Sequence, residues 1–201
     1  AAVFGQFDVT PGTHSGAGGF VEVSSGRTLT FNGNVRAGVD NRTGTLLLDP
    51  KNITIGSGSG DITDVFATNA SDDSTVAAST INSTLSAGTN VVLQANNDIT
   101  VSTAITAANA GGAGGALIMQ AGRSILINAN ITTDDGALTL TANDTLANGV
   151  VDGQRDSNAA VITMDTSGSG TTINTGAGTF TATISAGADK TNSRSGDITL
   201  D

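Results

Sequence analysis

The sequence contains no cysteine, no tryptophan and no tyrosine, and only two prolines and one histidine among its 201 residues. Without cysteine, neither a disulfide framework nor a thiolate metal site is available. The single histidine, His14, has no neighbouring partner of a catalytic triad or metal site, so it is expected in a solvated loop. Aromatic residues make up 3% of the chain, so any core must be filled by aliphatic and small side chains.

Positive charge is scarce as well. Eight Lys and Arg stand singly against 18 Asp and Glu, which gives a formal net charge of −10 at pH 7. A chain with no basic patch is not expected to bind nucleic acid or anionic lipid. No apolar run approaches the length of a membrane helix, so membrane insertion is not expected. No signal segment opens the sequence, which indicates a mature chain or one excised from a longer polypeptide.

Short segments rich in Val, Ile, Leu and Thr return about every 20 residues, separated by Gly, Asn and Asp. The clearest unit spans residues 91–105, recurs at 116–131 and opens a third time at 137–142. Each segment is too short to bury its apolar side alone, so stacking on neighbours must supply the core. The pattern predicts an all-β solenoid, a single domain over residues 1–201, whose aliphatic column includes Leu93, Ile118 and Leu138.

Four parts are expected within this solenoid: an N-terminal strand and possible assembly segment (1–17), first rungs (18–55), a polar excursion loop (56–80) and regular rungs (81–201). The Gly/Ser run at 56–60 and the polar run at 69–74 favour the loop. Ile81 and Leu85 are assigned to the resumed ladder. Helices are not expected, because no stretch of period 3.6 is flanked by caps and poor helix formers dominate.

Two local signals predict breaks in the first rungs. The dipeptide Asn32-Gly33 predicts a turn between two strands. Pro50 cannot donate to a strand ladder, so it is expected at a corner between residues 46–48 and 53–55.

The carboxylate pairs Asp72-Asp73 and Asp134-Asp135 are the candidates for polysaccharide cleavage or calcium binding. Cleavage requires opposed carboxylates, or a cation flanked by basic groups on one strand face, whereas adjacent strand residues point to opposite sides. We therefore expect both pairs in solvated loops, leave weak Ca²⁺ binding as their remaining use, and assign no cofactor, no catalytic residue and no enzymatic activity. Asn69, in an Asn-x-Ser/Thr triplet of the polar excursion, is the candidate glycosylation site.

Three segments, at residues 18–26, 44–55 and 79–95, occur in an order and spacing that resemble filamentous-haemagglutinin-like exoproteins of bacterial two-partner secretion systems. The similarity covers about residues 18–142. The resemblance implies a right-handed parallel β-helix (β-solenoid), an extracellular or bacterial cell-surface location, and a role in adhesion, surface structure or biofilm. The expected partners are further copies of the chain, or cell-surface or polysaccharide ligands.

The ends of a solenoid present unpaired strand edges. The expected assembly edges are Val3, Phe4, Phe7, Val9, Ile198 and Leu200. A structural or adhesive rod is the first hypothesis, and a filament whose copies complete each other's terminal rungs is the second. A polysaccharide-binding or polysaccharide-cleaving β-helix and an ice-binding solenoid are further alternatives. Ice binding requires Thr-x-Thr rows, and the triplets at 28–30, 139–141 and 179–181 are not expected in consecutive rungs.

Overall fold

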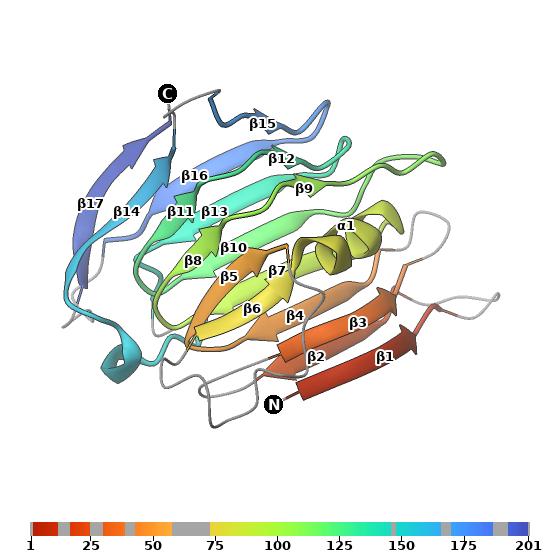
Figure 1. Ribbon diagram of the computed structural model, residues 1–201, viewed down its shortest axis with the longest axis horizontal. Helices are drawn as coiled ribbons and strands as arrows, with labels where there is room; N and C mark the ends of the chain where they lie inside the picture. Colours follow the sequence, from red (N-terminus) through yellow and green to blue (C-terminus); the bar gives the residue numbers. More distant parts are fainter. Residues whose placement is uncertain are drawn as a thin grey trace.

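The computed structural model describes residues 2–11, 17–24, 30–38, 43–57, 73–145, 148–165, 170–186 and 193–200. Within these ranges the protein is mostly β, and its strands form three sheets with eight, six and three members (Figure 1). All pairings between these strands are parallel. The expectation of an all-β chain with stacked parallel strands is confirmed at this level.

Most consecutive strands of the chain enter different sheets, so neighbours within a sheet come from different repeats. The eight-stranded sheet contains, in spatial order, β1 (Ala2–Asp8), β3 (Thr30–Arg36), β6 (Asp73–Ala77), β5 (Asn52–Gly56), β8 (Ile99–Val101), β11 (Ile125–Ile127), β14 (Asn158–Met164) and β17 (Ser193–Thr199). The six-stranded sheet contains β16 (Phe180–Ile184), β13 (Leu138–Ala142), β10 (Leu117–Ala121), β7 (Asn90–Ala95), β4 (Thr45–Asp49) and β2 (Phe20–Ser24). The three-stranded sheet contains β15 (Ile173–Asn174), β12 (Ile131–Thr132) and β9 (Ile105–Thr106).

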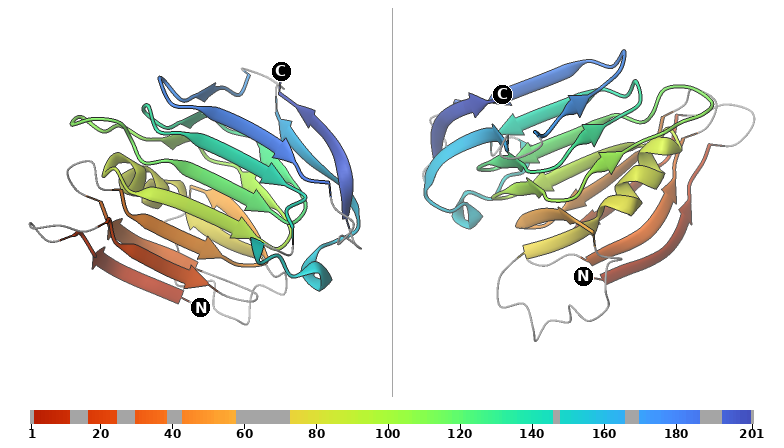
Figure 2. Two further views of the ribbon diagram at one scale, coloured as in Figure 1. Left: turned by 180° about the vertical axis from the view of Figure 1, so that it is seen from behind. Right: turned by 45° about the horizontal axis from the view of Figure 1, so that its top comes forward.

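Equivalent residues of successive repeats lie opposite one another, so each sheet carries rows of identical or similar side chains along the stack. One row of the six-stranded sheet consists of Leu46, Val91, Leu117, Leu138 and Phe180. One row of the eight-stranded sheet consists of Ile53, Ile99, Ile125, Ile162 and Ile198. In the three-stranded sheet the row is Ile105, Ile131 and Ile173. In both Figure 1 and Figure 2, β1 and β17 lie at opposite ends of the stack.

Apart from the exposed Phe180 and Ile198, the rows meet in one aliphatic core between the sheets. Along β7, β10 and β13 buried and half-buried residues alternate, as expected for strands with one face inward. Leu93 and Leu138 are fully buried in the same cluster, as predicted. Ile118 was assigned to this column wrongly: it lies half-buried on the outer face, between the buried Leu117 and Met119. Each fully buried Leu or Ile contributes about 1.5–3 kcal/mol relative to an exposed position.

A helix lies where none was expected. Strand β6 lies within the predicted excursion loop (56–80), and helix α1 (Ala78–Ser86) begins in its last three residues and continues into the predicted rungs. Residues 58–72 of that loop lie outside the described ranges. Ile81 and Leu85 therefore belong to a helix and not to the ladder. Both are fully buried, with Ala78, Thr80 and Thr84, so packing against the core compensates for weak intrinsic helix propensity.

The turn predicted at Asn32-Gly33 is also absent, because β3 runs straight through both residues. Gly33 lies opposite Gly5 of β1, whose φ of +121° favours glycine. A Cβ atom on Gly33 would lie 2.9 Å from the Phe31 ring and 3.0 Å from the Gly5 carbonyl oxygen. The glycine thus permits close strand packing instead of a turn. Pro50 does lie at the predicted corner, between β4 and β5.

Candidate functional site

Two neighbouring rows of outward side chains mark the outer face of the six-stranded sheet. The first, called here the apolar row, consists of Leu47, Val92 and Ile118. The second, called here the polar row, consists of Asp49, Gln94 and Gln120, two residues further along β4, β7 and β10. Because adjacent strands lie about 4.8 Å apart, each row repeats at that interval along the stack.

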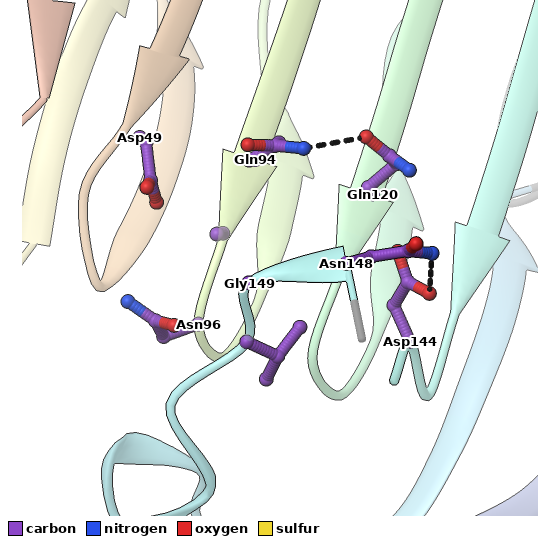
Figure 3. A pocket seen from close by; sticks show the side chains of 9 residues that line it. Asp49, Gln94, Asn96, Gln120, Asp144, Asn148 and Gly149 are labelled. Atoms are coloured by element: carbon purple, nitrogen blue, oxygen red, sulfur yellow. Dashed lines mark hydrogen bonds between the residues drawn. The ribbon is translucent and has the colours of Figure 1, made fainter. Parts of the chain in front are cut away.

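The two glutamines of the polar row are joined to each other. Gln94 Nε2 donates a hydrogen bond to Gln120 Oε1 at 2.8 Å (Figure 3). Their equal positions in the repeat and the parallel register bring the two amides into line. The amide nitrogen of Gln120 is turned toward the loop that carries Asp144 and Asn148 (Figure 3). The polar row therefore continues toward this loop.

That loop begins a longer segment, called here the corner strap, comprising residues 143–145 and 148–157 between β13 and β14. It contains the 3₁₀ turn η2 (Asp152–Gln154). The Val151 backbone nitrogen donates to Asn96 Oδ1 at 2.7 Å, and the Asp156 backbone nitrogen donates to Asn97 Oδ1 at 3.0 Å. The strap is thereby fixed to a corner that lies 55 to 59 positions earlier in the chain.

Two arginines stabilise this corner. Arg155 is buried, forms an ion pair with Asp152, and donates from Nη1 to the carbonyl oxygens of Gly122 and Asp144 at 3.3 and 3.1 Å. Arg123 forms an ion pair with Asp98 and donates from Nε to Asp98 Oδ1 at 2.8 Å. The hydrogen bonds to Asp98 raise the pKa of the Arg123 guanidinium. The contacts of Arg155 fix the strap beside the polar row.

A small cavity lies between the polar row and the strap. Asp144 lines it, together with Asp49, Gln94, Asn96, Gln120 and Asn148. Its volume is about 10 Å³, which is room for roughly one water-sized group. The site therefore cannot enclose a small-molecule substrate.

Asp144 is 1% exposed, yet only one of its two carboxylate oxygens has hydrogen-bond donors. Oδ1 accepts from the backbone nitrogen of Thr145 and from Nδ2 of Asn148, each at 2.8 Å. Oδ2 has no hydrogen-bond partner in the described part of the chain. A buried carboxylate oxygen without a donor is costly, so this atom is chemically poised to accept a hydrogen bond.

The surroundings of Asp49, at the other end of the polar row, change the pKa of its carboxyl group. Partial burial raises the pKa of Asp49, and the nearby negative charge of Glu22 on β2 raises it further. Glu22 and Asp49 are thus acidic side chains on the face that carries the amides of Gln94 and Gln120.

The residues proposed as assembly edges lie on the outermost strands or beside them. Val3 and Phe7 are partly buried against the core, and the rings of Phe7 and Phe31 stack with centroids 6.3 Å apart. The N-terminal strand therefore packs against the core through these two side chains. Phe4 and Val9 are exposed, as is Ile198 on β17, while Leu200 is partly buried against the core.

The carboxylate pair Asp134-Asp135 forms a turn, as predicted, with φ angles of +53° and +65°. Asp134 accepts a hydrogen bond from the Asn109 backbone nitrogen, and Asp135 accepts one from that of Ala177 at 2.6 Å. Both carboxylates thus support neighbouring turns. Asp73 lies in strand β6, so the expectation that it belongs to a loop is wrong. His14, Asn69 and Asp72 lie outside the described residues.

Threonines stack more regularly than the sequence suggested. β13 and β16 are neighbours, so Thr139 lies opposite Thr181 and Thr141 opposite Thr183. The strands that carry the triplets at 139–141 and 179–181 are therefore adjacent, contrary to the expectation, but the triplets are offset by two residues, so that only Thr181 of the second lies opposite a residue of the first. A longer row on the outer face of the eight-stranded sheet consists of Thr75, Thr54, Thr100, Leu126, Thr163 and Thr199.

Within the described ranges, no three His, Cys, Asp or Glu side chains gather at a point where they could ligate a metal ion. No helix of these ranges is long and apolar enough to cross a membrane. Comparisons with protein-family models, curated proteins and solved structures found no match to this chain. The resemblance to filamentous-haemagglutinin-like exoproteins therefore stays a prediction from the three sequence segments.

Proposed function

We propose that this chain is a right-handed parallel β-helix and acts as a non-enzymatic structural or adhesive rod outside a bacterial cell or on its surface. The in-register stacking of parallel strands around one aliphatic core is the observation that carries the proposal. Such a stack lengthens by adding repeats and presents flat faces along its length. The resemblance to secreted bacterial exoproteins supports the location.

The chemistry of the outer faces supports an adhesive role over a catalytic one. The two glutamines of the polar row, and the threonines on the outer face of the eight-stranded sheet, place uncharged polar groups on most strands along the stack, with Leu126 as the exception on β11. Repetition of weak contacts on a rigid support raises the overall strength of attachment. The cavity beside the polar row has a volume of only about 10 Å³, so adhesion through a surface fits better than turnover inside a cleft.

Electron microscopy and an adhesion assay with the purified chain together test this proposal. We expect elongated particles, and binding of chain-coated beads to bacterial or host-cell surfaces above the level of beads coated with an unrelated acidic protein. Compact particles that do not bind, or cleavage of a polysaccharide by the chain, would contradict it.

Assembly into filaments is a second candidate, favoured by the outermost strands of the eight-stranded sheet. Phe4 on β1 is 44% exposed and Ile198 on β17 is 43% exposed. Exposed apolar strands with a free edge are sites for strand addition by another chain. Phe4→Lys and Ile198→Lys, measured singly by sedimentation velocity, are expected to abolish concentration-dependent association, whereas an association unaffected by either would exclude these edges.

A further inference from the structure

We propose that the polar row, together with Asp144, binds an extended chain of a neutral, hydroxyl-rich polysaccharide, one of whose hydroxyl groups enters the cavity and donates a hydrogen bond to Asp144 Oδ2. The inference rests on the adhesive function proposed above and gives it a location and a ligand class. It is carried by three features of this face: the unsatisfied carboxylate oxygen, the paired rows and the sign of the charge.

The unsatisfied oxygen defines the deepest contact. Asp144 is only 1% exposed, and its Oδ2 has no hydrogen-bond donor in the described part of the chain. The adjoining cavity of about 10 Å³ admits a group no larger than a hydroxyl. A hydroxyl is a hydrogen-bond donor of the right size for this oxygen.

A metal cation fits this position less well than a hydroxyl. Calcium takes six to eight oxygen ligands, several of them from carboxylates. Three carboxylates do not gather here within the described ranges. Gln120 accepts the hydrogen bond from Gln94 through Oε1, and its amide group lines the same cavity as Asp144. A sugar hydroxyl, which both donates and accepts, suits a site that combines an acceptor oxygen with an amide donor.

The two rows define the direction of the ligand. A pyranose ring has apolar C–H faces and a polar hydroxyl edge. Leu47, Val92 and Ile118 offer apolar contact beside the hydrogen-bonding side chains of Asp49, Gln94 and Gln120. Both rows repeat about every 4.8 Å. That interval is close to the advance per sugar ring in an extended glycan, so a chain lying along the stack meets similar groups at successive rings.

The charge of the face selects a neutral ligand. Glu22, Asp49 and Asp144 are acidic, and the pKa of Asp49 is already raised by its burial and by Glu22. No described basic residue belongs to the polar row or the apolar row. Uronate or sulfate groups would be repelled here, because like charges cannot be compensated without a cation.

Isothermal titration calorimetry with linear cello-, manno- and xylo-oligosaccharides tests the inference, and oligogalacturonate serves as the acidic comparison. The variants are Asp144→Asn and the double variant Gln94→Ala/Gln120→Ala. The matched control is Thr106→Ala/Thr132→Ala on the three-stranded sheet. We expect at least one neutral series to bind, and both site variants to weaken it by roughly tenfold, the effect of losing one or two hydrogen bonds. The control should bind like the unmodified chain.

Thermal unfolding of each variant by circular dichroism separates loss of binding from loss of fold. If Asp144→Asn unfolds at a much lower temperature, the binding test rests on the glutamine variant alone. That variant changes only half-buried side chains on the outer face. Absence of binding by every neutral series, preference for oligogalacturonate, or equal binding by the site variants and the control would each overturn the inference. Adhesion of coated beads that survives in the glutamine variant would leave the adhesive function intact and place its site elsewhere.

Discussion

The side-chain oxygen of Asn82 on α1 accepts a hydrogen bond from the backbone nitrogen of Thr106 on β9, at 2.7 Å. One helical turn later, Ser86 Oγ accepts one from the Ala108 backbone nitrogen at 2.9 Å. Residues four apart in a helix rise about 6 Å, and residues two apart in a strand advance about 6.6 Å. The helix therefore replaces a neighbouring strand at the outermost position of the three-stranded sheet and satisfies donors that strand pairing would otherwise satisfy.

Removing these two acceptors should loosen the edge of β9. For Asn82→Ala/Ser86→Ala we expect a loss of about 1–3 kcal/mol in the free energy of unfolding, because two backbone donors lose their partners. Hydrogen exchange measured by NMR should accelerate at the amides of Thr106 and Ala108. Ser79→Ala, at an exposed position of the same helix, should leave both amides unchanged. Equal exchange in both variants would contradict the role of α1.

The alternation along the strands predicts different costs for two leucines. Leu93 is fully buried and Leu47 is half-buried on the outer face. Leu93→Ala should lower the free energy of unfolding by about 2–5 kcal/mol, through lost burial and a cavity in the core. Leu47→Ala should cost less than half as much. Urea denaturation of both variants measures the difference, and similar losses would contradict the inward direction of Leu93.

A glycine at the entry to β13 allows successive repeats to approach closely. A Cβ atom on Gly136 would lie 2.3 Å from the Gly115 carbonyl oxygen, whereas one on Gly153 would meet nothing within 4 Å. Gly136→Ala should therefore destabilise the protein by about 1–3 kcal/mol, through overpacking against backbone. Gly153→Ala should be close to neutral. Thermal unfolding of the pair measures this contrast, which would vanish if the repeats were not stacked here.

The raised pKa of Asp49 predicts a pH-dependent effect on stability. Since burial and Glu22 disfavour the ionised carboxylate in the folded state, ionised Asp49 weakens the fold at neutral pH and neutral Asp49 does not. Asp49→Asn should raise the unfolding temperature at pH 7, and this gain should shrink as the pH falls through the pKa of Asp49 and vanish below its ordinary value of 3.8. A gain that persisted at the lowest pH would assign the effect to packing.

Local sequence patterns predicted the regular repeats well. The alternation around Val91 and Leu117 and the shared order of three short segments correspond to β7–β9 and β10–β12. The local sequence pattern gave wrong predictions where contacts with residues distant in the sequence determine the structure. Residues 78–86 have weak helix propensity and become helical because Ile81 and Leu85 pack against the core. The Asn-Gly dipeptide at Gly33 is typical of a turn, but Gly33 lies in a strand because it pairs with Gly5 of β1, which is distant in the sequence.

The candidate site was missed for a related reason. Gln94 and Gln120 occupy the same place in two copies of the repeat, which was the available signal. Whether the two side chains can form a joint site depends on the strand register, which places them side by side on the outer face. Asp144 reaches the site through the corner strap, whose partners Asn96 and Asn97 lie more than 50 positions away. No local pattern encodes such a contact.

The central claim is that parallel strands of successive repeats stack in register around one aliphatic core. NMR distance restraints from an isotope-labelled sample test it most directly. The stacking predicts contacts from Met119 to both Leu93 and Leu140, its partners in β7 and β13, with the pattern of parallel strands. Contacts between strands consecutive in sequence, with the pattern of antiparallel hairpins, would contradict it.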